Sequence, residues 1–251
     1  MLAGTSRLAA GKETAGVGVR LLSGFELSGN GEVVSLPLSA QRLVALLALR
    51  NRPLLRAYVA GTLWLDASEE RSAASLRSAL WRVHRPGYRV IEANGSTLHL
   101  AGNVRVDVHE AEALARRLLE HGSDADERAP LDTLAAELLP DWYDDWVVVE
   151  REQLRQLCLR ALESYAERLF AAGTYERAAD SAFAAVRSDP LRESAHRLLI
   201  RVHLAEGNWS DAVHQYRLYA KLLRKQLGLR PSPQIEALVN GLPKAVRATD
   251  A

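Results

Sequence analysis

The sequence predicts a mainly α-helical fold with a small β component, organised as two domains. Strand and hairpin signals are confined to roughly the first 100 residues. From about residue 108 onward, apolar residues recur with helical periodicity, and part of this region repeats every 34 residues. We therefore expect one domain at residues 19–107 and an all-helical domain at residues 108–241, with a disordered segment at 1–18 and a tail at 242–251.

The composition is typical of a folded protein and argues against several classes of function. Of the 251 residues, 48% are hydrophobic and 25% are charged. The single cysteine, Cys158, excludes an intramolecular disulfide and a Cys-rich zinc site, and its apolar neighbours indicate a core position. No P-loop, dinucleotide-binding fingerprint or hydrolase motif is present, and the seven histidines are scattered. We therefore expect neither an enzyme nor a cofactor or metal site.

No stretch of the sequence predicts contact with a membrane. The longest apolar runs fall short of the roughly 18–20 residues that a membrane-spanning helix needs. The first 18 residues lack the apolar block of a signal peptide. We therefore expect a cytoplasmic protein.

Charge is divided unevenly, although the whole chain carries a formal net charge of only +1. Residues 19–108 hold 11 arginines against 7 acidic residues, a net charge of +4. Residues 109–251 hold 19 basic against 23 acidic residues, a net charge of −4. This asymmetry indicates a basic module attached to an acidic one.

The first domain begins with short strands and continues with three helices. Val19–Phe25 and Glu32–Leu36 have the composition of strands around the turn Gly29-Asn30-Gly31. The helices are predicted from N-cap residues, apolar periodicity and proline stops, and they cover Ser39–Arg50, Arg56–Leu65 and Glu69–Arg85.

A hairpin follows the third helix. Tyr88–Ala93 and Ser96–Leu100 are rich in strand-forming residues and flank Asn94-Gly95. Asn-Gly is favoured in type I′ turns because both central residues need positive φ. Strands, three helices and a hairpin, in that order, are typical of the winged helix-turn-helix.

The second domain is predicted to be helical throughout. Helices are expected at His109–His121 and Leu131–Leu139, joined by a polar loop, and a long helix follows up to about Ala172. An aromatic group, Trp142, Tyr143 and Trp146, precedes or opens this long helix. We interpret it as packing between helices; a surface that recognises a ligand or peptide is the alternative.

Residues 161–223 carry an internal repeat. The 34-residue step relates five pairs of similar residues: Gly173 with Gly207, Tyr175 with Trp209, Ala178 with Ala212, Ala171 with Ala205 and Ala182 with Tyr216. This step is the tetratricopeptide period, in which Gly permits a tight turn and small Ala residues let two helices approach closely. The second domain is therefore predicted to be a tetratricopeptide-like repeat domain.

The third helix, Glu69–Arg85, is the candidate functional element. Its predicted core stripe is Ala73, Leu76, Leu80 and Val83. The polar residues of the other side are Arg71, Ser75, Arg77, Ser78, Arg82 and Arg85. No acidic residue lies between Arg71 and Arg89. Arg and Ser on a helix can bind base edges and phosphates in the major groove, and Arg89 on the hairpin can bind neighbouring phosphates. A merely solvated arginine face is the alternative.

These motifs resemble a known family of regulators. The runs SLRSALWRVHR and PGYRV resemble the OmpR-type winged helix of the Streptomyces antibiotic regulatory protein family. VDVHEAEAL, DPLRESAHRLLIRVHLAEGNW and LGLRPSP look like its bacterial transcriptional activation domain. The resemblance implies an activator of secondary-metabolite or similar gene clusters that binds repeated sites, pairs with a second copy on them, and engages the sigma or alpha subunit of RNA polymerase.

Carried over by residue, the resemblance places the basic recognition positions on Arg77, Arg82 and Arg85, with Ser75 and Ser78 as neighbours. The sequence departs from the family at Trp81 and His84, where small or basic residues are more usual. The link to the hairpin, Pro86-Gly87, is also short. The expected partner is double-stranded DNA. A protein-interaction scaffold, whose winged helix docks protein, is the alternative function, motivated by the near-neutral net charge.

Overall fold

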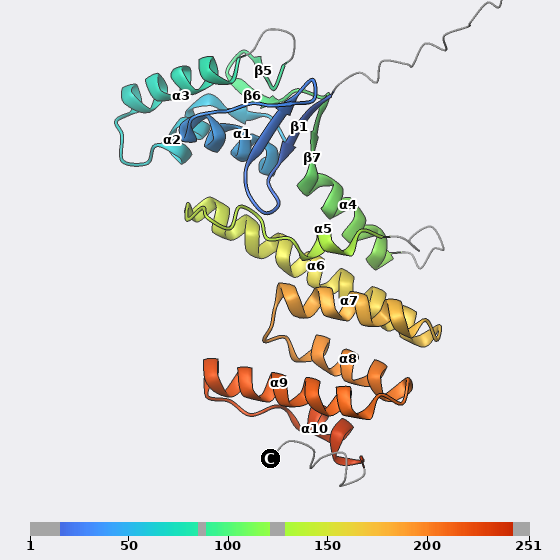
Figure 1. Ribbon diagram of the computed structural model, residues 1–251. Coiled ribbons are helices and arrows are strands. Elements are labelled where there is room, and N and C mark those ends of the chain that lie inside the picture. Colours follow the sequence, from blue (N-terminus) through green and yellow to red (C-terminus); the bar gives the residue numbers. More distant parts are fainter. Residues whose placement is uncertain (1–15, 85–88, 121–128, 243–251) are drawn as a thin grey trace, which may run out of the picture. The chain divides into compact units, whose positions relative to one another are not determined.

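The structure is a computed structural model that describes residues 16–84, 89–120 and 129–242. The chain divides into two compact units, Met1–Asp107 and Val108–Ala251, here called unit 1 and unit 2. The described strands all lie in unit 1, and unit 2 is helical (Figure 1). The predicted fold class, mainly α with a small β component, is confirmed.

A four-stranded sheet opens unit 1. Its strands are ordered β3-β2-β1-β7 and comprise β1 (Val17–Arg20), β2 (Glu26–Gly29), β3 (Glu32–Val33) and β7 (Val104–Val106). The prediction of one strand over Val19–Phe25 was wrong. Positive φ angles at Ser23 (64°) and Gly24 (139°) turn the chain there, so that β1 and β2 pair antiparallel.

This sheet differs from prediction in two further ways. Strand β1 starts at Val17, inside the segment expected to be disordered, because Val17 and Val19 are fully buried in the core. Strand β7 pairs parallel with β1, with Val17 opposite Val104. The sequence did not predict β7, since three residues carry too little pattern to identify a strand.

The hairpin formed by β2 and β3 contains a type I′ turn. Ser28 pairs with Val33 and Gly29 with Glu32, which leaves Asn30-Gly31 as the two turn residues. Both have positive φ, 53° and 83°, as this turn type requires.

Three helices follow in unit 1, and the first of them lies in the core of the unit. They are α1 (Leu38–Arg50), α2 (Arg56–Leu63) and α3 (Glu69–Val83). Helix α1 begins at Leu38, one residue before the predicted Ser39, and Pro37 is its N-cap. Leu43, Val44, Leu46 and Leu47 are all at most 1% exposed, so α1 is surrounded by the other elements of the unit.

Unit 1 also contains a second sheet, of three strands in the order β4-β6-β5. Strands β5 (Ile91–Asn94) and β6 (Thr97–Leu100) form the predicted hairpin, and β4 (Leu54–Leu55), which was not predicted, pairs with β6. The order of strands and helices is that of a winged helix, as predicted.

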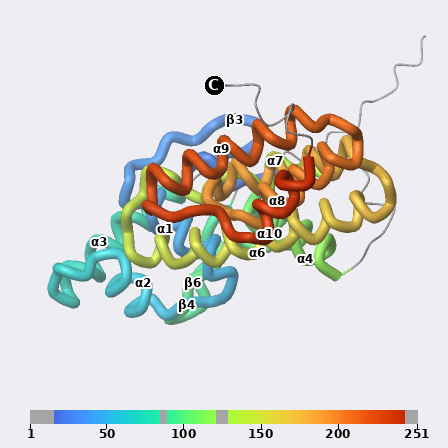
Figure 2. The backbone as a smooth tube through the Cα atoms, turned by 90° about the horizontal axis from the view of Figure 1, so that it is seen from below, coloured from blue at the N-terminus to red at the C-terminus, as the bar shows by residue number. Residues whose placement is uncertain are grey.

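Unit 2 is a stack of helices. Its helices are α4 (Asp107–Glu120), α5 (Leu131–Ala135), α6 (Asp145–Ala171), α7 (Tyr175–Ser188), α8 (Glu193–Ala205), α9 (Trp209–Leu227) and α10 (Pro233–Asn240). Each of α6 to α9 packs against the next, as Figures 1 and 2 show. Helix α5 is shorter than the predicted Leu131–Leu139.

The 34-residue repeat is confirmed in three dimensions. Gly173 and Gly207 end their turns with nearly equal positive φ angles, 76° and 78°. The same backbone hydrogen bonds surround both: Thr174 N–H donates to the Leu169 carbonyl at 2.9 Å, and Asn208 N–H donates to the His203 carbonyl at 2.8 Å. A β-carbon is disfavoured at such φ, which explains the two equivalent glycines.

Candidate nucleic-acid interface

Helix α3 packs against the rest of unit 1 along one stripe of buried side chains. The buried residues are Ser72, Leu76, Ala79 and Val83, and the helix packs against α1 and α2. The predicted stripe was partly wrong, since Ala73 and Leu80 are only half-buried. Burial of Ser72 is possible because its hydroxyl donates to the Glu69 carbonyl at 2.9 Å.

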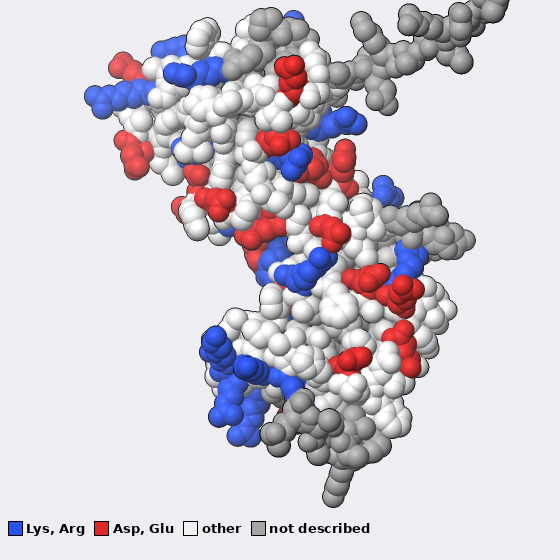
Figure 3. Space-filling model, in the orientation of Figure 1, with Lys and Arg blue, Asp and Glu red and all other residues white. Residues whose placement is uncertain are grey.

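The stripe determines which residues face away from the unit. Among the predicted DNA-binding residues, Arg71, Arg77, Ser78 and Arg82 are exposed, whereas Ser75 is half-buried. Arg85 lies outside the described residues. Blue side chains over α3 are visible in Figure 3. The exposed face between Arg71 and His84 therefore carries arginine and no acidic residue.

The side-chain charges of α3 change sign along the helix, from acidic in the first turn to basic after it. Glu69 and Glu70 occupy the first turn, where the helix dipole favours negative charge. Among the described residues, Arg71 and Arg77 have no acidic partner within ion-pair distance. Their charges are therefore available to an external anion.

The hairpin after α3 has a different turn from the one predicted. Asn94 pairs with Thr97, so the two turn residues are Gly95 and Ser96. Positive φ is found at Gly95 (57°) but not at Ser96. A glycine with positive φ in the first position indicates a type II′ turn, so the type I′ prediction for Asn94-Gly95 was wrong. Arg89, just before this hairpin, is exposed.

Two apolar features of α3 were not part of the predicted site. Trp81 is 76% exposed. A cavity of about 530 Å³ lies between α2 and α3, with Trp64 and Leu76 in its wall and Arg77 at its border. A predicted core stripe of Ser72, Leu76, Ala79 and Val83 would have placed Trp81 on the outer face, because these residues share the opposite side of the helix.

Unit 2 has a separate basic surface on α9 and the residues that follow it, here called the α9 basic surface. Its members are Arg217, Lys221, Arg224, Lys225 and Arg230. All but the half-buried Arg217 are exposed, and no acidic residue occurs between Arg217 and Arg230. Figure 3 shows these positive side chains gathered at the left-hand end of α9. Leu227 and Leu229, 55% and 56% exposed, lie within the same segment.

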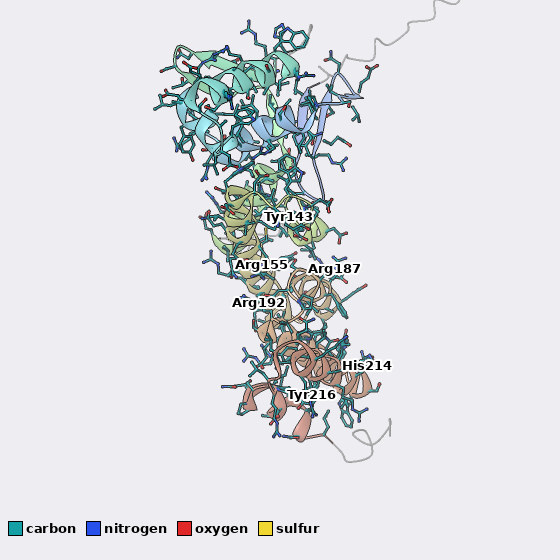
Figure 4. All side chains as sticks on the ribbon, turned by 90° about the vertical axis from the view of Figure 1, so that its left-hand side faces the viewer. Tyr143, Arg155, Arg187, Arg192, His214 and Tyr216 are labelled. Atoms are coloured by element: carbon teal, nitrogen blue, oxygen red, sulfur yellow. The ribbon has the colours of Figure 1, made fainter. Side chains whose placement is uncertain are left out.

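The aromatic group at the start of α6 is divided between core and surface. Trp146 is 9% exposed and meets Trp142 edge to face at 6.4 Å between ring centroids. Tyr143, labelled in Figure 4, is 82% exposed. The Arg151 guanidinium donates to the carbonyls of Leu138 (2.7 Å) and Trp142 (2.8 Å) and so holds this segment. The packing interpretation therefore holds for the two tryptophans.

A second cavity, of about 540 Å³, lies between α5, α6 and α7. Its arginines are already engaged: Arg155 pairs with Asp189 and Arg187 pairs with Asp132, at 2.7 and 2.6 Å. Cys158 is 4% exposed in its wall, and burial raises the pKa of this thiol to about 12. The cysteine is therefore a core residue held as a neutral thiol.

Metal-binding clusters and membrane-spanning helices are both absent from the described residues. Within residues 16–84, 89–120 and 129–242, no group of three or more His, Cys, Asp or Glu side chains is arranged to hold a metal ion. None of the helices in this part of the chain combines the length and apolar character needed to span a bilayer.

The chain is similar to known proteins in both sequence and fold. The family model "Bacterial transcriptional activator domain" matches residues 106–242. Regulatory protein AfsR of Streptomyces coelicolor is 26% identical over 222 residues, which cover 83% of this chain and 22% of AfsR. The chain thus spans about a fifth of the length of this relative.

A solved structure has a similar fold. It is EmbR of Mycobacterium tuberculosis, in complex with a low-affinity phosphopeptide. The TM-score is 0.63 with 22% sequence identity, and the match covers 93% of this chain and 68% of the EmbR chain.

A winged helix and a helical-repeat unit, matched to these relatives, define the class of the protein as a two-unit transcriptional regulator. The chain belongs to the family of proteins that carry the bacterial transcriptional activator domain. This family is one of regulators rather than enzymes, in agreement with the resemblance seen in the sequence.

Proposed function

We propose that this regulator binds double-stranded DNA sequence-specifically in the cytoplasm and activates transcription from nearby promoters. The observation that carries the proposal is the outer face of α3, where Arg71, Arg77 and Arg82 are exposed and no acidic residue lies between them in the sequence. An α-helix fits the major groove, where arginine donates two hydrogen bonds to guanine O6 and N7. Helix α3 is therefore the element that reads bases.

The hairpin supports α3 through the DNA backbone. Arg89 is exposed, and the turn at Gly95 and Ser96 is exposed as well. Contacts to phosphate contribute affinity and orientation but no direct sequence information. Arg85 remains a proposed recognition residue, with Ser75 and Ser78 as neighbours.

Unit 2 has the proposed role of binding RNA polymerase, through the sigma or alpha subunit, and a second copy of the chain on repeated sites. The α9 basic surface supports this role, because exposed cations beside Leu227 and Leu229 suit an acidic partner segment with apolar side chains. The family model supports activation rather than repression.

The test of DNA binding begins with selection of duplexes from a random-sequence pool. The selected duplex is then bound, at one salt concentration, by wild type and by the double variant Arg77→Ala/Arg82→Ala. A single lost base contact weakens binding by about 1–3 kcal/mol, so the double variant should bind at least about tenfold more weakly. Salt is held constant because phosphate contacts make affinity steeply dependent on it.

Arg20→Ala is the matched control, since Arg20 is an exposed arginine of unit 1 on β1 and pairs with Glu26. It should bind as wild type does. Equal binding by the double variant would remove α3 from the interface. Failure to enrich any sequence, together with binding of a protein partner by unit 1, would favour the protein-scaffold function instead.

A further inference from the structure

Trp81 is the large apolar side chain on the outer face of α3, in the last turn of the helix. It is 76% exposed, while Ser72, Leu76, Ala79 and Val83 are buried on the opposite side. At 3.6 residues per turn, Trp81 lies about 170° around the helix from the middle of this buried stripe. It therefore points in the direction in which the helix faces away from unit 1.

The neighbours of Trp81 on the helix are polar or cationic. Arg77 and Ser78 lie one turn earlier, and Arg82 is adjacent in sequence; all three are exposed. A single exposed apolar residue is common on protein surfaces. This one, however, lies among the arginines of a proposed DNA-binding face, so it enters the groove whenever they do.

The chemistry of the major groove restricts what the indole ring can contact there. The base edges present hydrogen-bond donors and acceptors, and their apolar group is the C5 methyl of thymine. Indole carries one donor and a large apolar surface. Burial of that surface against a methyl group is favourable, whereas burial against unpaired polar base edges is unfavourable.

We propose that Trp81 reads thymine by packing its indole ring against the thymine C5 methyl group. This inference rests on the proposed function, because it requires α3 to lie in the major groove. It adds an apolar specificity contact between the arginines and makes thymine a preferred base of the recognised sequence.

The experiment uses the full chain and the duplex selected from the random-sequence pool. Each thymidine is replaced in turn by deoxyuridine, which removes the C5 methyl group and keeps the Watson–Crick pair. Burial of one methyl-sized group is worth about 0.8 kcal/mol, which is about fourfold in affinity. Wild type should therefore lose about fourfold at one or two positions.

The variants separate a direct contact from an indirect effect. Trp81→Ala should bind the thymine duplex more weakly and should show no further loss with uracil at the same positions. Trp81→Phe, which keeps an apolar ring, should retain the dependence on the methyl group. Val33→Ala is the control, since Val33 is 70% exposed but lies on β3, and it should behave as wild type.

The outcomes also separate this inference from the proposed function. Sequence-specific binding that is unaffected by uracil, or a uracil effect of equal size in Trp81→Ala, overturns the role of Trp81 and leaves DNA binding intact. If wild type enriches no sequence, both the proposed function and the inference fail.

Discussion

The carboxylate of Asp107 accepts the backbone N–H of Leu21, at 2.9 Å to Oδ1, across 86 residues of sequence. Oδ2 of the same carboxylate accepts the N–H of Leu22 at 3.0 Å. Asp107 follows β7 directly, and Leu21 follows β1, its parallel neighbour. The two bonds join the ends of these strands.

Asp107→Ala is expected to destabilise unit 1 by about 2 kcal/mol, since it leaves the N–H groups beside the fully buried Leu21 without this acceptor. Urea unfolding followed by far-UV circular dichroism measures the change. Asp66→Ala, at an exposed position between α2 and α3, is the control and should change stability by less than about 0.5 kcal/mol. Equal midpoints for the two variants would contradict the role of Asp107.

A bidentate ion pair joins α6 to the start of α8. Arg192, labelled in Figure 4, donates to both Glu163 carboxylate oxygens at 2.7 and 2.8 Å, and the two side chains are 25% and 17% exposed. A double-mutant cycle with Arg192→Ala and Glu163→Ala should give a coupling energy of about 2 kcal/mol.

The same cycle on Arg201 and Glu167 is the matched control. This pair also joins α6 to α8, at 2.7 Å, but is 36% and 51% exposed. Solvent screens it, so its coupling energy should be below about 1 kcal/mol. Equal coupling energies for the two pairs would show that burial is not the deciding factor.

His196 should make the stability of unit 2 sensitive to mild acid. Burial lowers the pKa of this side chain from its ordinary value of 6.5. Its Nε2–H donates to the Pro190 carbonyl at 3.0 Å, and Nδ1 accepts from the Gln215 amide. Above pH 6.5 both folded and unfolded states are neutral; as pH falls below 6.5, only the unfolded state takes up the proton, so stability decreases.

Urea unfolding of unit 2 at pH 7.5 and pH 5.5 tests this linkage. His196→Phe should be less stable than wild type at pH 7.5, because Gln215 loses its acceptor, and should lose less stability on acidification. His214→Gln, which changes an exposed histidine on α9, should keep the wild-type pH dependence. An unchanged pH dependence in His196→Phe would refute the assignment.

The same substitution should have opposite effects at two glycines. Gly61 lies inside α2 without a positive φ, and a β-carbon there meets open space. Gly61→Ala should therefore stabilise unit 1 by about 1 kcal/mol. Gly207 has a φ of 78°, so Gly207→Ala should destabilise unit 2 by about 1–2 kcal/mol. Thermal unfolding of both variants gives the two signs, and a shift in the same direction would be inconsistent with this explanation.

Arg89→Ala should weaken DNA binding without changing the preferred sequence. A contact to one phosphate contributes about 0.9 to the slope of log affinity against log salt concentration. Titrations at several salt concentrations should show a slope shallower by about that amount, and repeated selection should recover the same sequence. A changed sequence preference would mean that Arg89 reads a base.

Sequence alone determined the features of this protein that depend on local pattern. Apolar periodicity predicted the main helices, and the 34-residue step predicted the repeat, because each repeat contains the same turn around Gly173 or Gly207. The order of elements predicted the winged helix. Local signals decide such features, since a helix or a tight turn is specified mainly by its own residues.

Tertiary structure decided what depends on contacts distant in sequence. The pairing of β7 with β1, and the bonds from Asp107 to Leu21, bring together segments that share no local pattern. The rotation of α3 was decided in the same way. Ala73 and Leu80 suit a core stripe as well as Ser72 and Ala79 do, but packing against α1 and α2 buries the latter pair and leaves Trp81 outside.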